Sequence, residues 1–194
     1  MMPFGSVRRE LVAALVAGTL LLSGHHLSGG ATGPSSTALK AQMKVLEAVI
    51  NETMGQTFAP PFGLLEKAKG TYLPNFGVVF SLEVNLYPVR IPNPFDVRPL
   101  SKEELEKARK VKLERIRTIK QAVPRLLADH GSTLREIGAD ESIAVVVHLF
   151  HFQAEGESLP TQIVMEVKKS DLDQYWDKKL SFDALREKVK TLEL

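Results

Sequence analysis

Three of the five histidines, His130, His148 and His151, lie beyond residue 31. Histidine is the side chain that most often serves as a metal ligand or as a general base near neutral pH. His148 and His151 fall within an apolar run, Ser142–Phe152, that predicts a strand. Because they are an odd number of residues apart, they point to opposite faces and cannot share one metal ion. We therefore predict no metal site, a hydrogen-bonded His148 in the core or at an edge, and a His130 that ends a helix.

Other residues with catalytic potential do not form a recognisable site either. Ser132 follows His130 closely, but the strand–turn–helix setting of a nucleophile elbow is missing. Acidic pairs occur in predicted turns or at a helix start, where carboxylates are favoured by the helix dipole; they are Asp140/Glu141, Glu155/Glu157 and Asp171/Asp173. The chain contains no cysteine, which excludes thiolate catalysis, iron–sulfur clusters and attachment of c-type haem. We predict no catalytic residue and no cofactor.

The segment 102–125 is the most basic part of the chain, with nine Lys or Arg residues against four Glu. On a helix, Lys112 falls within the broad apolar arc, and Arg109 and Arg115 lie at its flanks. One interpretation is that their stems lie along apolar surface and their charges reach water. The other is that Lys112 meets a carboxylate or an anionic ligand between helix and sheet, because an unpaired buried charge is costly. The second interpretation predicts a small-ligand or anion-binding module that uses Arg109, Lys112 and Arg115.

Aromatic residues gather near a predicted turn at Pro74 and a proline-rich connection at 88–100. Tyr72, Phe76 and Tyr87 are the residues concerned. Aromatic side chains are enriched in protein interfaces, so Tyr72 and Phe76 are candidate contact residues for a protein or a glycan. Packing of Phe76 in the core is the alternative.

Alternating apolar residues predict the strands that position these groups. In Ser142–Phe152 both alternation sets are apolar, which indicates a central strand covered on both faces. Residues 78–87 and 162–168 alternate apolar and polar residues, as in strands with one buried and one wet face. The turn Leu73-Pro74-Asn75-Phe76 has suitable residues at its centre.

Helical periodicity with capping residues predicts the other elements. One helix spans about residues 37–54, and a long one begins at the capping box Ser101/Glu104, is kinked or restarted at Pro124, and ends near His130. Two short helices start at about Ser170 and Ser181, the last with an inner stripe through Leu192. The predicted fold is α+β: an antiparallel sheet of three to four strands, with a long helix and shorter terminal helices packed on it, in the order α-ββ-α-ββ-αα. We expect the helices mainly on one face of the sheet, and the central strand partly covered on the second face.

The first 31 residues have the layout of a secretory signal peptide: two arginines, an aliphatic run from Leu11 to Leu22, and a small-residue region. The aliphatic run is shorter than the ~20 residues that a spanning helix needs. We therefore predict a signal peptide at 1–31, a linker at 32–36 and a single α+β domain at 37–194, with no stable membrane span in the mature chain. The expected location is periplasmic or extracellular.

The mature chain is nearly neutral, because 23 basic residues (25 − 2) oppose 22 acidic ones (23 − 1). A nucleic-acid-binding protein normally carries a clear basic excess, so nucleic acid is not an expected partner. The function expected first is that of an exported, non-enzymatic protein of the cell envelope or exterior, acting through contact with a protein partner. The alternative is the ligand-binding module described above, and the third is a hydrolase with an unrecognised site.

Overall fold

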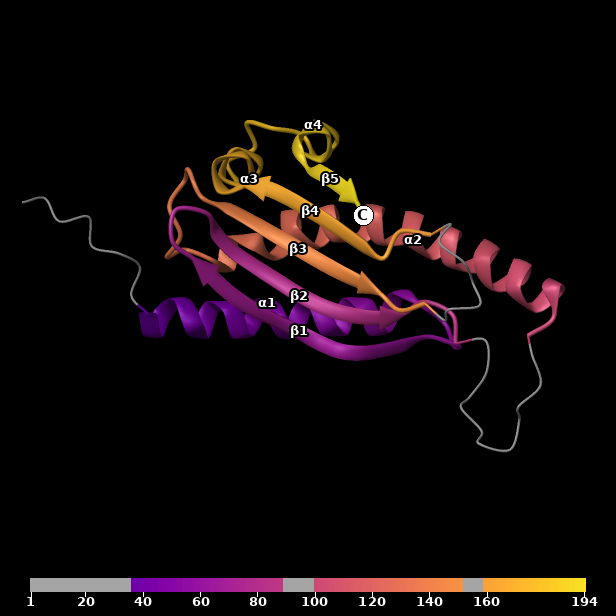
Figure 1. Ribbon diagram of the computed structural model, residues 1–194. Helices are drawn as coiled ribbons and strands as arrows, with labels where there is room; N and C mark the ends of the chain where they lie inside the picture. The colour runs from indigo at the N-terminus through magenta and orange to yellow at the C-terminus, as the bar shows by residue number, and fades with distance from the viewer. Residues whose placement is uncertain (1–35, 89–99, 152–158) are drawn as a thin grey trace, which may run out of the picture. The chain divides into compact units, whose positions relative to one another are not determined.

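The computed structural model describes residues 36–88, 100–151 and 159–194. The predicted signal peptide, most of the linker and most of the proline-rich connection lie outside these residues. The described chain is an α+β fold (Figure 1), with elements in the order α1 (Ser36–Thr57), β1 (Gly63–Leu73), β2 (Gly77–Asn85), α2 (Lys102–His130), the 3-10 turn η1 (Gly131–Thr133), β3 (Ser142–Leu149), β4 (Gln162–Lys168), α3 (Lys169–Trp176), α4 (Phe182–Lys188) and β5 (Lys190–Glu193).

The sheet is mixed, so the antiparallel prediction is wrong in this respect. Its five strands lie in the order β1-β2-β3-β4-β5, and β2 pairs with β3 in parallel while the other pairs are antiparallel. The cause is α2, which links the end of β2 to the start of β3. A long connection can carry the chain back to the end of the sheet at which β2 starts. β3 then begins beside the start of β2 and runs in the same direction.

The fifth strand, β5, was also not predicted. The final helix ends at Lys188, and the backbone at Val189 is already extended, with φ −72° and ψ 112°. Residues 190–193 then pair with β4 and are exposed throughout. Leu192, predicted on the inner stripe of the helix, is instead 54% exposed on this edge strand. A four-residue strand is too short to show a periodicity that separates it from the end of a helix.

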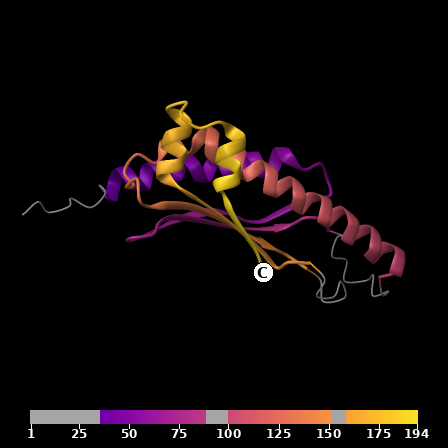
Figure 2. The ribbon, with the colours of Figure 1, turned by 90° about the horizontal axis from the view of Figure 1, so that it is seen from above.

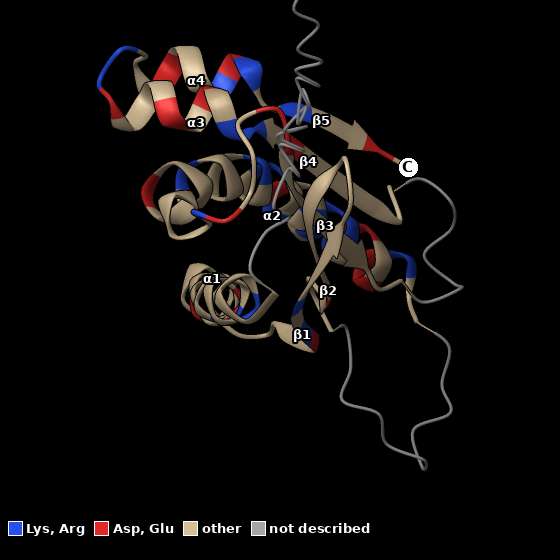
Figure 3. Ribbon diagram, turned by 90° about the vertical axis from the view of Figure 1, so that its left-hand side faces the viewer, with Lys and Arg blue, Asp and Glu red and all other residues tan. Residues whose placement is uncertain are grey.

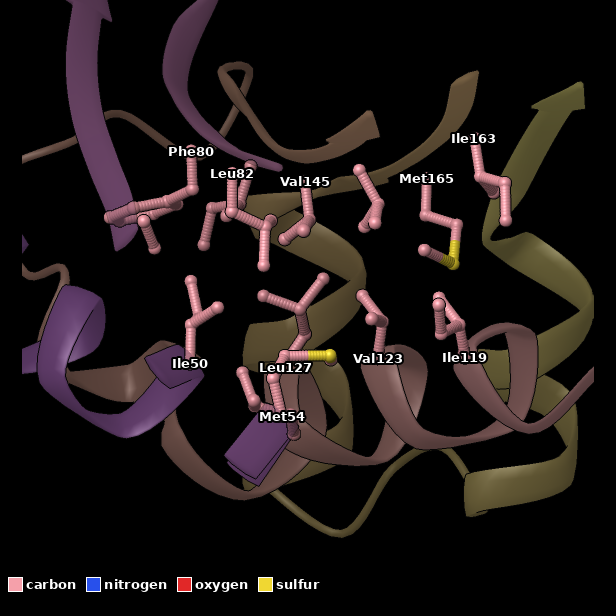
Figure 4. Close-up of a cluster of buried hydrophobic side chains, with 14 of the residues drawn as sticks. Ile50, Met54, Phe80, Leu82, Ile119, Val123, Leu127, Val145, Ile163 and Met165 are labelled. Carbon is pink, nitrogen blue, oxygen red and sulfur yellow. The ribbon is translucent and has the colours of Figure 1, made fainter. Parts of the chain in front are cut away.

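The four α-helices of the described residues lie on one face of the sheet, as Figure 2 shows. From the strands, side chains such as Phe80, Val145 and Met165 project toward Ile50 of α1 and Ile119 of α2 (Figure 4). The residues of this helix-facing set are completely or almost completely buried: Val78, Phe80, Leu82, Val84, Ile143, Val145, Val147, Leu149, Ile163, Met165 and Val167. The prediction that helices pack mainly on one face is confirmed.

The turn before β2 has the predicted chemistry. Asn75 has a φ of 66°, and the Phe76 N–H donates to the Leu73 carbonyl at 3.1 Å, as in a turn with a left-handed third residue. Gly77 follows with a φ of 121°, and a Cβ there would meet the Ser142 carbonyl oxygen at 2.1 Å. Glycine at position 77 therefore lets β2 and β3 start side by side.

The capping box that opens α2 is confirmed, with Ser101 and Glu104 each accepting from the other's backbone N–H. The helix runs through the buried Pro124 as one element, rather than restarting there. Ser181 caps α4 as predicted, whereas α3 begins one residue before Ser170 and has no side-chain cap. None of the helices in the described parts of the chain is long and apolar enough to cross a membrane.

Candidate functional site

Arg115, a predicted anion ligand, contacts backbone carbonyls of two other segments. Its guanidinium donates to the carbonyl of Ala59 at 2.7 Å and to those of Pro61 and Leu86, and it lies 5.6 Å from the centre of the Phe58 ring. Burial lowers the pKa of Arg115, but arginine stays protonated in proteins. The side chain therefore joins α2 to the α1–β1 connection and to the end of β2.

Lys112 and Arg109 occupy two further, different environments. Lys112 is completely buried, and its Nζ donates to the Phe150 carbonyl at 3.3 Å at the seam between α2 and the end of β3. Its charge does not reach water, so the snorkelling interpretation does not describe this residue. Arg109 is exposed on α2. Arg109 is thus exposed, Lys112 is buried, and Arg115 is engaged by backbone carbonyls. The role of these three residues in anion binding stays a prediction.

Tyr72 and Phe76 flank the turn at Pro74, while Tyr87 lies beyond the opposite end of β2. The Tyr72 hydroxyl donates to Glu141 at 2.7 Å, and this hydrogen bond raises the pKa of the Tyr72 phenol above its ordinary value. Tyr72 also lines a groove of about 430 Å³ with residues from the start of α1, namely Ser36, Leu39, Lys40 and Met43. Phe76 is half-buried. A contact role for Tyr72 and Phe76 remains untested.

The face of the sheet opposite the helices is the largest feature that the predicted site residues do not touch. In Figure 2 the helices lie to one side of the strands, with the start of α2 extending past the end of the sheet, and no described helix is packed on the other side (Figure 3 gives the view along the strands). We call this side the open face. The strand registers place on it Lys69, Thr71, Val79, Ser81, Glu83, Ser142, Ala144, Val146, His148, Gln162, Val164, Glu166, Lys168, Lys190 and Leu192.

Hydrogen bonds tie the strands together across one end of the open face. Nε2 of His148 on β3 lies 3.1 Å from Oγ of Ser81 on β2, and Nδ1 of His148 lies 3.2 Å from Nε2 of Gln162 on β4. The prediction that His148 is a hydrogen-bonded histidine is confirmed. Toward the other end, Ser142 donates to Glu166 at 2.8 Å, again across β3 and β4. Both networks fix side-chain positions on the face.

A serine beside a histidine invites comparison with a catalytic pair, but the arrangement is unfavourable for catalysis. Nε2 of His148 lies near the Ser81 hydroxyl and Nδ1 near the Gln162 amide, so neither of these ring contacts is to a carboxylate that would stabilise an imidazolium. Glu83 lies directly opposite His148 and on the same face as Ser81, where its carboxylate opposes a developing oxyanion. His130 ends α2 on the helix side of the sheet. Among the described residues, no group of three or more His, Asp or Glu side chains is arranged to hold a metal ion.

Between the two polar networks runs an apolar row. Val146 lies opposite Val164, and Val164 lies opposite Leu192. Val79 and Ala144 pair beside this row. Val79, Val146 and Val164 are half-buried, and Leu192 is exposed. An apolar centre with a polar rim is the usual composition of a protein–protein interface.

No protein-family model matches this chain, and no curated protein or solved structure matches it.

The alternation within single strands predicted outward-pointing polar residues but not that they form one surface. The alternation of β2 and β4 correctly predicted that Ser81, Glu83 and Gln162 point away from the core. The apolar second face of β3 was interpreted as partly covered; on it Ser142 and Ala144 are buried, and Val146 and His148 are half-buried. The strand order, which puts Val146 between Ser81 and Val164, could not be obtained from alternation alone.

Proposed function

We propose that this protein acts by contact rather than by catalysis, and that it binds a protein partner through the open face of its sheet. The observation that carries the proposal is the apolar row Val146–Val164–Leu192 on a face that no described helix covers. Contiguous apolar surface with a polar rim commonly marks an interaction site. The hydrogen-bonded networks at both ends support a preformed surface, which lowers the entropic cost of binding.

The charges on the face favour a protein partner over a phosphate-rich one. Among the residues that define the open face, two glutamates and three lysines carry charge: Glu83, Glu166, Lys69, Lys168 and Lys190. Nucleic acids and anionic membranes are bound through a clear basic excess. A face with both positive and negative charges instead suits a protein partner that also carries both. Complementary charge pairs then attract the partner and fix its orientation on the face.

The test compares Val164→Glu on the open face with Val45→Glu on α1. Val45 is 51% exposed and lies on the helix side, so it is a matched control for adding a surface charge. We expect the wild-type protein and Val45→Glu to co-purify from the native source with the same stoichiometric protein, and Val164→Glu to lose it. Val164→Thr, which keeps a β-branched side chain, should weaken the complex less.

Equal retention by Val164→Glu and Val45→Glu would contradict the proposal, as would a wild-type protein that elutes without any stoichiometric partner. Urea unfolding of each variant separates lost binding from lost folding. A bound small molecule in place of a protein would favour the ligand-binding alternative.

We further propose that the protein works outside the cytoplasm, in the periplasm or the exterior. The support is the signal-peptide layout of residues 1–31. Mass spectrometry of the native protein should find an N-terminus near residue 32. A native protein that keeps Met1 and remains in the cytoplasm would exclude export.

A further inference from the structure

The two edge strands of the sheet, β1 and β5, differ in how their outward backbone groups are hydrogen-bonded. At the β1 edge, α1 supplies acceptors for strand donors: the Ala68 N–H donates to Asn51 at 2.7 Å, and the Gly70 N–H donates to Glu47 at 2.8 Å. The register of β1 with β2 also shifts twice, which makes the strand irregular. Covered and bulged edges resist pairing with another strand.

At the opposite edge, no described strand pairs with the outer side of β5. Leu194 and Gln162 exchange both backbone hydrogen bonds, at 3.0 and 3.1 Å. Because antiparallel pairs alternate, Leu192 and Lys190 also direct their backbone groups toward β4, whereas Thr191 and Glu193 direct theirs away from the sheet. All residues of β5 are exposed. The groups that would receive another strand are therefore those of Thr191 and Glu193.

We propose that β5 pairs antiparallel with β5 of a second copy of this chain, about a two-fold axis through Leu192. Thr191 then lies opposite Glu193 of the second copy. By symmetry, Glu193 lies opposite Thr191 of the second copy. Residues opposite one another in such a pair exchange both backbone hydrogen bonds, so this register satisfies every outward group of the strand. The contact is isologous, which is the common form of a homodimer.

The side chains select this register over its neighbours. It places Lys190 opposite Leu194, Thr191 opposite Glu193, and Leu192 opposite Leu192 of the second copy, with no like charges facing each other. Moving the axis to Glu193 places two carboxylates directly opposite one another, which is destabilising. Moving it to Thr191 places Leu192 against Lys190 and leaves Glu193 without an opposing strand residue.

Pairing through β5 also extends the apolar row of the open face. The row Val146–Val164–Leu192 would continue through Leu192 of the second copy and the same residues in reverse order. Leu192 and Leu194, which are 54% and 59% exposed, would gain apolar neighbours. The inference stands on the geometry of β5 and does not depend on the protein-partner function proposed above.

The test uses a single cysteine, because the chain has none of its own. Opposed residues that do not exchange hydrogen bonds have Cα atoms about 4.5 Å apart, within the range that a disulfide spans. In a glutathione buffer containing the oxidised form, Leu192→Cys should form a covalent dimer at least about tenfold faster than Val45→Cys, a control cysteine at a site of similar exposure.

A second variant, Thr191→Pro, tests the backbone pairing. The Thr191 N–H points away from β4, so proline removes an intermolecular donor and no bond within the sheet. Sedimentation of the purified chain from micromolar to millimolar concentration should show a reversible dimer. Thr191→Pro should raise its dissociation constant at least about tenfold, with an unchanged unfolding midpoint.

Each outcome decides the inference. A wild-type chain that stays monomeric throughout this range, or a Leu192→Cys chain that cross-links no faster than Val45→Cys, overturns it. A dimer that Thr191→Pro leaves intact overturns the β5 register. Loss of the dimer with retention of a different protein partner would leave the proposed function standing, so the two failures can be told apart.

Discussion

Arg115 shows, at the scale of a single residue, how a cation at a helix flank can hold the fold together. Its planar group reaches carbonyls from the α1–β1 connection and from the end of β2. The sequence places Arg115 at the edge of the apolar arc of α2, which predicts partial burial. It does not show which carbonyls lie within reach, because these come from segments more than twenty-five residues away.

Arg115→Ala should lower the free energy of unfolding by about 2 kcal/mol. Hydrogen bonds from a charged donor are worth roughly 1.5–3 kcal/mol, and the Arg115 side chain is only half-buried. Arg115→Lys should recover little, since an ammonium lacks the planar fork. Arg109→Ala, on the exposed face, should change the free energy by less than about 0.5 kcal/mol. Urea unfolding measures all three, and added inorganic phosphate should not stabilise the wild type.

Tyr72 gives a prediction in alkaline solution. Its hydrogen bond to Glu141 favours the neutral phenol, so the pKa of Tyr72 is higher in the folded chain than in the unfolded chain. The folded state then holds its proton more tightly, and the resulting stabilisation is present below about pH 10 and is lost as the pH rises through the folded pKa.

Tyrosinate absorbance should therefore show one of the three tyrosines titrating late, and Tyr72→Phe should remove that component. Glu141→Gln should bring the pKa of Tyr72 back toward the ordinary value for tyrosine. An unchanged titration in both variants would show that the hydrogen bond does not form in solution.

At the scale of elements, local patterns predicted what local forces decide. The Ser101/Glu104 capping box, the Pro74-Asn75 turn and the alternation of β2 and β4 were all identified from neighbouring residues. The parallel pairing of β2 with β3 and the short β5 were not, because both depend on contacts between segments distant in the chain. Helix α2 crosses Pro124 because tertiary packing of a buried residue outweighs a lost helical hydrogen bond.

The α1–β1 edge yields a stability prediction. Glu47 is buried and accepts from the Gly70 N–H, so Glu47→Ala should cost about 1–3 kcal/mol by leaving that donor unsatisfied. Glu47→Gln keeps an acceptor and should cost less. The exposed Glu52, one and a half turns further along α1, serves as the control, and Glu52→Ala should be close to neutral. Equal effects of Glu47→Ala and Glu52→Ala in urea would mean that α1 does not seal this edge.

At the scale of the whole molecule, the fold divides the sheet into two unlike faces. One carries the core between strands and helices (Figures 2 and 4). The other carries an apolar row between polar networks. The sequence predicted the α+β class and the helix-covered face. It could not predict the composition of the open face, because that surface is assembled from every strand of a mixed sheet.

The most direct test of the open face as an interface is lysine footprinting by acetylation and mass spectrometry, on the purified chain and on its native complex. Lys69, Lys168 and Lys190 report on the open face, and the exposed Lys107 and Lys110 on α2 are the controls. We predict that Lys69 and Lys168 react more slowly in the complex while the α2 lysines are unchanged; protection of Lys190 alone would reflect only β5 pairing. Protection of Lys107 and Lys110, with Lys69 and Lys168 as reactive as in the free chain, would contradict the account.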